Sequence, residues 1–83
     1  MFESLLNKKL KMEEEILQLI YIRIRKFRHE KGYTQQNIAD LLKISQNAYC
    51  KIENGHTRLL VSTLISLAGI FEVRLCNFFN DAK

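Results

Sequence analysis

The sequence contains no proline, and only three of its 83 residues are glycine: Gly32, Gly55 and Gly69. Hairpins need turn-forming residues every few positions, so this composition argues against a protein built mainly of short strands. Hydrophobic residues make up 47% of the chain, which is enough for a packed interior. A disordered chain is therefore not expected. A single small helical domain is therefore expected.

Long apolar runs are also missing. The stretch "LLV" (59–61) is far too short to span a bilayer, and no apolar segment follows the charges of the first residues, as a signal peptide would require. We therefore expect a soluble protein without membrane contact, retained in the cytoplasm where it is made.

Groups for metal binding or catalysis are sparse. Cys50 and Cys76 are 26 residues apart, without a CxxC motif, and His29 and His56 are isolated from other ligand types. This spacing predicts two free, buried or semi-buried thiols and no metal site. No paired carboxylates, activated nucleophile or glycine-rich loop is recognisable, so neither an enzyme nor a cofactor is expected, and the chain is too short for a small-molecule effector domain.

Positive charge is concentrated in the middle of the chain. Residues 20–60 carry eight Lys or Arg against three acidic residues, a surplus of +5, whereas residues 1–19 have a net charge of −1 and residues 61–83 balance at zero. A basic middle suits a polyanionic partner.

Apolar periodicity predicts a first helix at about 13–31. Ile20, Ile24, Phe27 and Lys31 form one stripe, and Gly32 follows as a left-handed stop. Residues 1–19 are expected to be a helical extension of a domain at 20–79. Their apolar residues lie at near-helical spacing and would either fold back over a second apolar face of the first helix or pair with another copy: Phe2, Leu5, Leu6 and Leu10.

Two short helices are predicted next, at 35–42 and 46–53. Thr34 and Ser45 are suitable N-caps, and each is flanked by an apolar pair that can form a hydrophobic staple. Only about three residues join the two helices, so they form a helix-turn-helix. Apolar residues at 61–71 and 73–79 predict a fourth helix and a short fifth, which gives an all-α, five-helix architecture.

In a helix-turn-helix, the second helix lies in the DNA major groove with its N-terminal residues against base edges. Gln46 and Asn47 carry amides suited to adenine, and Lys51 can reach guanine. We interpret these three residues as the base-reading set.

The stretch "TQQNIADLLKISQNAYCKIENG" (34–55) also strongly resembles the Cro/repressor (XRE-like) helix-turn-helix family, whose pattern runs T-Q-x-x-(I/L)-A, a hydrophobic-Ser pair and I-E-N-G. The resemblance covers about residues 20–79 and implies a compact, lambda-repressor-like domain. The stretch "STLISLAGIFEVRLCNFF" (62–79) looks most like the restriction–modification controller proteins of that family.

The resemblance implies further roles. Arg28 and Glu53 match an internal ion pair, and Gln35 matches a phosphate-binding glutamine. Cys50 would stand at the edge of the base-reading set. DNA-backbone contacts are implied for Gln35, Ser45, Asn54, Thr57 and Arg58, with His56 in the same loop.

Three departures from the family pattern carry structural expectations. Lys43 replaces a turn glycine, so the turn must strain or hold a left-handed lysine. Asn37 replaces a glutamate, which would leave Thr34 a single cap instead of a capping box. "RLLVS" replaces the polar-Pro-Ser segment that usually leads into the next helix. We expect four apolar residues in or after this segment to form either a dimer interface or part of the core: Leu59, Leu60, Phe78 and Phe79.

The leading functional hypothesis is a sequence-specific transcriptional regulator that binds double-stranded DNA as a homodimer on a palindromic operator. The alternative is an antitoxin-like protein-interaction module, in which the apolar N-terminal helix or the Leu/Phe surface binds a partner protein. Salt dependence separates the two, because phosphate contacts weaken steeply with salt.

Overall fold

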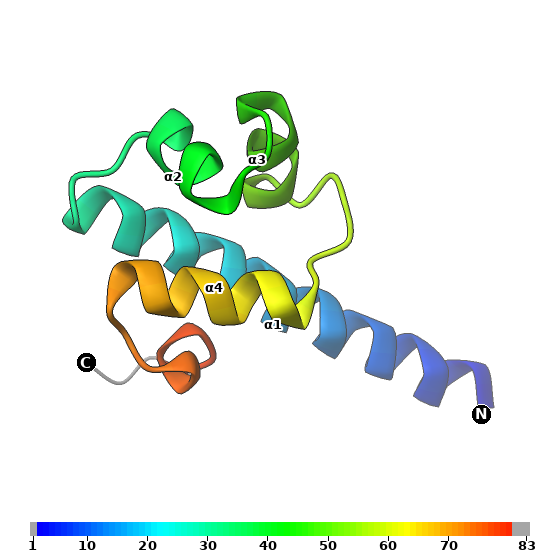
Figure 1. The fold of residues 1–83 in the computed structure, drawn as a ribbon. Helices are drawn as coiled ribbons and strands as arrows, with labels where there is room; N and C mark the ends of the chain where they lie inside the picture. Colours follow the sequence, from blue (N-terminus) through cyan, green and yellow to red (C-terminus); the bar gives the residue numbers. More distant parts are fainter. Residues whose placement is uncertain (1, 81–83) are drawn as a thin grey trace.

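The computed structural model describes residues 2–80, with the side chains of residues 4–80. This part of the chain is all-helical (Figure 1) and comprises α1 (Phe2–Glu30), α2 (Gln35–Leu42), α3 (Gln46–Glu53), α4 (Val61–Phe71) and a 3₁₀ turn, η1 (Leu75–Phe78). The all-α prediction is confirmed. The count of five helices is slightly wrong, because the last segment has only four residues and closes with short-range bonds such as Phe79 N to Cys76 O.

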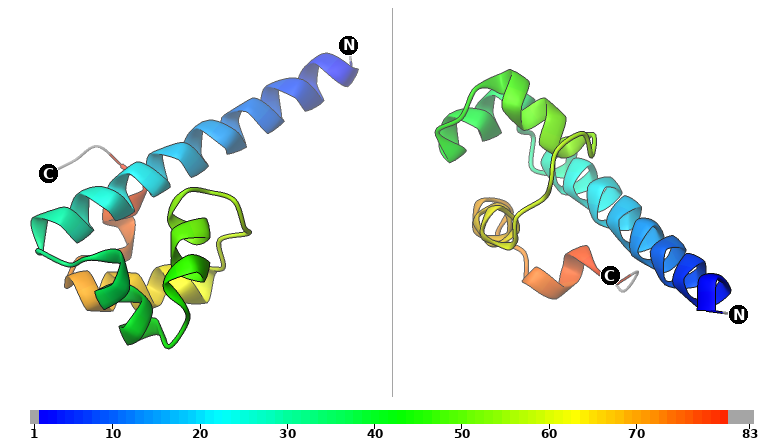
Figure 2. Two further views of the ribbon diagram at one scale, coloured as in Figure 1. Left: turned by 90° about the horizontal axis from the view of Figure 1, so that it is seen from above. Right: turned by 90° about the vertical axis from the view of Figure 1, so that its right-hand side faces the viewer.

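Helix α1 is much longer than predicted. It begins at Phe2 instead of about residue 13, since neither glycine nor proline interrupts the segment. Its N-terminal half projects away from the other elements in every view (Figures 1 and 2), so of the two expected arrangements the described residues do not fold back over α1, and pairing with another copy stays a prediction. Residues 4–18 are exposed, and burial begins at Leu19 and Ile20, while the side chain of Phe2 lies outside the described part.

The core lies between α1 and the other elements. Its largest fully buried apolar side chains come from all of them: Ile24, Ile38, Tyr49, Leu67, Phe71 and Phe78. Phe27 of α1 meets Phe78 edge to face, with ring centroids 5.5 Å apart, and lies 6.2 Å from Phe71. These aromatic contacts fix α4 and η1 beneath α1 and leave α2 and α3 on the other side (Figure 1).

Burial corrects part of the predicted dimer interface. Phe78 is wrong as an interface residue, because η1 turns it into the core against Phe27. Leu59 is half-buried and packs against the core, while Leu60 and Phe79 are exposed. The cysteines are free as predicted, but Cys76 is exposed where a buried or semi-buried thiol was expected.

The connections around α2 and α3 follow local backbone chemistry. Lys43 adopts the left-handed conformation, with φ 61° and ψ 43°, so the turn holds a left-handed lysine. Thr34 Oγ1 accepts from Asn37 N at 3.0 Å and Thr34 N donates to Asn37 Oδ1 at 2.9 Å. The single-cap prediction is therefore wrong, since the asparagine amide closes the capping box in place of a glutamate.

Candidate nucleic-acid interface

A buried carboxylate fixes the C-terminal end of α3. Glu53 is 1% exposed and Arg28 of α1 is 8% exposed. The structure brings these two residues into a bidentate pair, with Arg28 Nε donating to Glu53 Oε2 at 2.7 Å and Nη2 donating to Oε1 at 3.0 Å. A planar guanidinium matches both carboxylate oxygens, so this pair sets orientation as well as distance.

Two more side chains reach the Glu53 carboxylate, and a third reaches its backbone. Tyr49 Oη donates to Glu53 Oε2 at 2.7 Å, and Gln35 Nε2 donates to Oε1 at 2.9 Å. Arg25 Nη1 donates to the backbone oxygen of Glu53 at 3.0 Å. We call Arg28, Gln35, Tyr49 and Glu53 the support cluster, because it ties α1, α2 and α3 together at one carboxylate. Sequence reasoning missed Tyr49 and Arg25, although Tyr49 lies one helical turn before Glu53 and could have been found from that spacing.

The support cluster carries fixed charges. Burial alone would raise the pKa of the Glu53 carboxyl, but hydrogen bonds from Arg28, Gln35 and Tyr49 outweigh it and lower that pKa below its ordinary value. Burial, and then the hydrogen bond to Glu53, raise the pKa of the Tyr49 hydroxyl. The hydrogen bond to Glu53 likewise raises the pKa of Arg28. These directions keep the glutamate and arginine charged and the tyrosine neutral, as a structural role requires.

The N-terminal end of α3 faces solvent. Ser45 caps it, with Oγ accepting from Ala48 N at 3.0 Å. Gln46 and Asn47 occupy the first turn, Lys51 follows one turn after Asn47, and all three are exposed. The structure therefore presents the predicted base-reading residues on one short helix whose other end is held by Glu53.

The predicted backbone-contacting residues surround this helix. Ser45, Asn54, Thr57 and Arg58 are exposed, and Asn54 Nδ2 donates to Cys50 Sγ at 3.3 Å. Gln35 differs from them, because it is half-buried and one amide hydrogen is directed to Glu53. An amide nitrogen has a second hydrogen, so Gln35 can support the cluster and still donate outward.

Comparison with known proteins agrees with this geometry. The helix-turn-helix family model matches residues 24–78, which include α2, α3, α4 and η1. The chain belongs to the helix-turn-helix family.

The helix-turn-helix domain also resembles a curated protein, the SPbeta prophage-derived uncharacterized HTH-type transcriptional regulator YonR of Bacillus subtilis (strain 168). The two are 41% identical over 51 residues, which is 61% of this chain. The chain spans about half of that relative's length, because the match covers 47% of it. No solved structure matches the chain.

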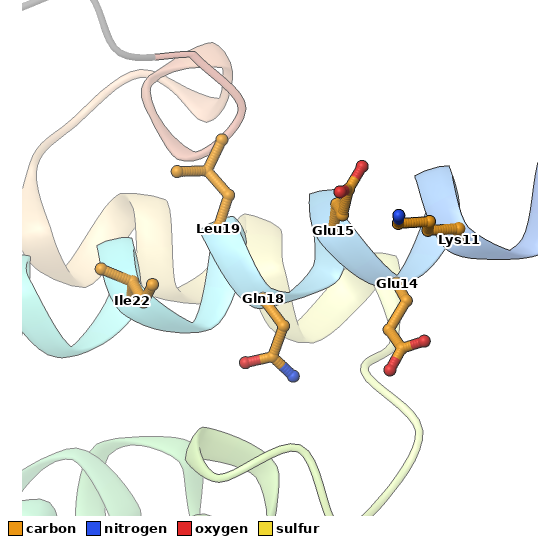
Figure 3. Close-up of a pocket in the computed structure, with 6 residues that line it drawn as sticks. All are labelled: Lys11, Glu14, Glu15, Gln18, Leu19 and Ile22. Atoms are coloured by element: carbon orange, nitrogen blue, oxygen red, sulfur yellow. The ribbon is translucent and has the colours of Figure 1, made fainter.

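One hollow of the helix-turn-helix chain lies along α1 and includes no side chain of α3. Its volume is about 480 Å³, and all of its lining side chains come from α1 (Figure 3): Lys11, Glu14, Glu15, Gln18, Leu19 and Ile22. It is thus the surface of a single helix. No group of three His, Cys, Asp or Glu side chains in residues 2–80 could hold a metal ion, and no helix of that range is long and apolar enough to cross a membrane.

Proposed function

We propose that the protein is a transcriptional regulator that binds double-stranded DNA in a sequence-specific manner and reads it with α3. One observation supports this proposal most strongly. The first turn of α3 exposes Gln46 and Asn47, while the support cluster holds the opposite end of the same helix through Glu53. Membership of the helix-turn-helix family and the similarity to YonR, which is named as a transcriptional regulator, support the same function.

The chemistry of the exposed residues suits base edges. The amides of Gln46 and Asn47 can each donate to N7 and accept from the N6 amino group of one adenine, and the Lys51 ammonium can reach guanine O6 and N7. A good bidentate pair contributes about 1–3 kcal/mol of discrimination against the wrong base. Ser45, Asn54, Thr57 and Arg58 would contact phosphates and fix the position of α3 on the duplex.

We further propose that the regulator acts as a homodimer on a palindromic operator. A single domain of this size buries little DNA surface, and two-fold pairing on half-sites about 34 Å apart is the usual remedy. From the predicted interface near α4 and η1, Leu60 and Phe79 remain exposed, whereas Phe78 is buried. The restriction–modification controller type remains a proposal that rests on the sequence of residues 62–79.

The direct test is selection of bound duplexes from a random DNA library by the purified protein. We expect enrichment of a symmetric motif with half-sites about one helical turn apart. If the folded protein enriches no sequence, the proposal is wrong, and the alternative of a protein-interaction module gains support from the exposed apolar residues of α1.

Substitutions test whether α3 is the helix that reads the DNA bases. Lys51→Ala should weaken binding and broaden the preference at one operator position, at a cost of about 1–3 kcal/mol. Lys26→Ala is the matched control, since Lys26 is an exposed lysine of α1 and its loss removes the same charge. Gln35→Ala should weaken all duplexes alike, and because Gln35 also donates to Glu53, its unfolding must be measured in parallel. Equal effects of Lys51→Ala and Lys26→Ala on the selected motif would contradict reading by α3.

A further inference from the structure

The N-terminal part of α1 exposes a large amount of apolar surface. We call residues 4–18 the arm, which projects beyond the body of the molecule (Figures 1 and 2). Its apolar side chains are 41–63% exposed: Leu5, Leu6, Leu10, Met12, Ile16 and Leu17. Single exposed apolar residues are ordinary, but a contiguous group of this kind marks an interaction surface.

The exposed group continues the stripe that packs the core. Leu6, Leu10, Leu17 and Ile24 lie on one face of α1, since they are separated by four, seven and seven residues. Ile24 at the end of this row is fully buried by the body, whereas the other three are exposed. The same helix face is therefore covered along the body and uncovered along the arm.

The order of side chains along the arm indicates what covers it. Lys11 is the midpoint of a pattern that is apolar at both ends and charged between them, with Lys8 and Lys9 on one side and Glu13 and Glu14 on the other. Read in reverse about Lys11, the pattern keeps its apolar positions and exchanges the sign of the four charges at 8, 9, 13 and 14, while Lys11 falls on itself and Glu15 on Asn7. A second arm that runs in the opposite direction would therefore complement this one.

We propose that the arms of two copies pair as antiparallel helices centred at the level of Lys11. Leu5 and Leu6 of one copy then lie level with Leu17 and Ile16 of the other, so that apolar residues meet at both ends of the contact. Lys8 and Lys9 lie level with Glu14 and Glu13.

Charge selects the orientation. A parallel pair would place Lys9 beside Lys9 and Glu13 beside Glu13, and such like-charge neighbours are unfavourable. Glu13 lies beside Leu6 and Leu17 on the helix surface, and Lys9, one helical turn before it, flanks the same face, so their charges act at the edge of the contact. Antiparallel pairing converts these repulsions into two symmetry-related attractions.

The lengths also fit. With Lys11 at the centre, residue 2 of one copy reaches the level of Ile20 of the other, where burial by the body begins. The overlap is about 28 Å at a rise of about 1.5 Å per residue, and the two bodies lie at opposite ends of it.

The arrangement is also compatible with DNA, a point that rests on the proposed function. Gly55 lies against Tyr21 and Glu53 against Arg28, so α3 ends beside residues 21–28 of α1. Antiparallel arms separate the two copies of this region by about 30–50 Å along α1, a range that includes the spacing of about 34 Å between half-sites. Self-association itself does not require DNA.

The first test is sedimentation equilibrium of the full chain without DNA. The wild type should be a dimer, and Leu6→Asp with Leu17→Asp should be a monomer over the same concentration range, because two charges enter an apolar contact. The matched control is Ile22→Asp. Ile22 is 51% exposed, close to the 47% of Leu6, but lies on the opposite face of α1 and should leave the dimer intact. Thermal unfolding of each variant checks that the body is folded, since all three altered side chains are exposed.

The second test determines the orientation. Lys9→Glu and Glu13→Lys should each weaken the dimer about tenfold, since either change turns both attractions into repulsions. The double variant Lys9→Glu/Glu13→Lys should restore it, and so should an equimolar mixture of the two single variants. Unchanged dimerisation in both single variants would overturn the antiparallel arrangement, because in a parallel pair each change merely exchanges one like-charge pair for another.

The two proposals can fail separately. A folded wild-type monomer that still selects a DNA motif would overturn arm pairing and leave the proposed function standing. A dimer that responds to the arm variants as expected but enriches no DNA would support arm pairing and overturn the proposed function.

Discussion

At the scale of single residues, the Glu53 side chain joins α1, α2 and α3. Its two carboxylate oxygens receive four hydrogen bonds, from Arg28, Gln35 and Tyr49. Removing one partner from a buried ion pair leaves the other charge without compensation. The position of α3 therefore depends on one buried acidic group.

We expect Glu53→Gln to lower the free energy of unfolding by about 3 kcal/mol, because Arg28 would remain buried without a counter-charge. Urea unfolding followed by circular dichroism measures this change. Asp40→Asn is the control, since Asp40 accepts from Gln36 at 2.7 Å in an exposed pair whose loss should cost at most about 0.5 kcal/mol. Equal losses of unfolding free energy in the two variants would show that burial of the Glu53 ion pair adds nothing to its effect on stability.

The same carboxylate predicts acid sensitivity. The pKa of Glu53 is lower in the folded protein than in the unfolded chain, where a glutamate has a pKa of about 4.3. The folded state therefore binds fewer protons, and its stability is fully present above that value and declines as the pH falls through the folded-state pKa. Thermal midpoints between pH 7 and pH 3 should fall for the wild type and more shallowly for Glu53→Gln. If the thermal midpoints of the wild type and Glu53→Gln fell equally with pH, protonation of Glu53 would not be the cause of the acid sensitivity.

Sequence reasoning at this scale succeeded where a residue acts through its neighbours in the chain. The caps at Thr34 and Ser45 and the exposure of Gln46 and Asn47 follow from local patterns. For partners distant in sequence, spacing gave nothing, and the Arg28–Glu53 pair was expected only because the family resemblance implied it. The bond from Gln35 to Glu53 spans 18 residues, and the burial of Phe78 depends on Phe27, so neither could be inferred from spacing alone.

At the scale of elements, helix lengths and turns reflect which residues are absent. Periodicity located α2 and α3 because caps mark both of their starts, whereas the start of α1 was placed too late because the segment from Phe2 onward lacks both a cap signal and a breaker. The apolar spacing of residues 1–19 did predict a helical extension. That this extension and the first helix form one uninterrupted helix was seen only in the structure.

The turn between α2 and α3 carries backbone strain that a substitution can relieve. A non-glycine residue in the left-handed region costs about 1–2 kcal/mol, and glycine at Lys43 would avoid this at an entropic cost of about 0.5–1 kcal/mol. Lys43→Gly should therefore stabilise the domain by up to about 1 kcal/mol. Lys26→Gly, in the interior of α1, should instead destabilise it by about 1 kcal/mol. Chemical unfolding of both variants checks the opposite signs, and a loss of stability in Lys43→Gly would show that the lysine side chain stabilises the turn.

At the scale of the whole molecule, charge and shape are divided along the chain. The surplus of +5 belongs to residues 20–60, which form most of the helix-turn-helix, while residues 1–19 have a net charge of −1 and include the arm. Under the two proposals, attraction to DNA and association between copies thus belong to different parts of one small protein.

This division predicts opposite responses to salt. DNA affinity should fall by about 10³–10⁵ between 50 and 200 mM salt if six to ten phosphates are contacted. Arm pairing should change far less, because most of the proposed contact is apolar. Fluorescence anisotropy with a selected duplex and sedimentation without DNA provide the two curves. A DNA affinity that is insensitive to salt would argue against phosphate contacts.

The division of α3 into a buried face and an exposed face has a consequence for evolution. Glu53 and Tyr49 are buried in the fold, whereas Gln46, Asn47 and Lys51 are exposed. Exchanges at exposed positions usually change stability by no more than about 0.5 kcal/mol. Under the proposed function, a lineage would therefore acquire a new DNA preference by mutating the exposed residues while the scaffold beneath them stays the same.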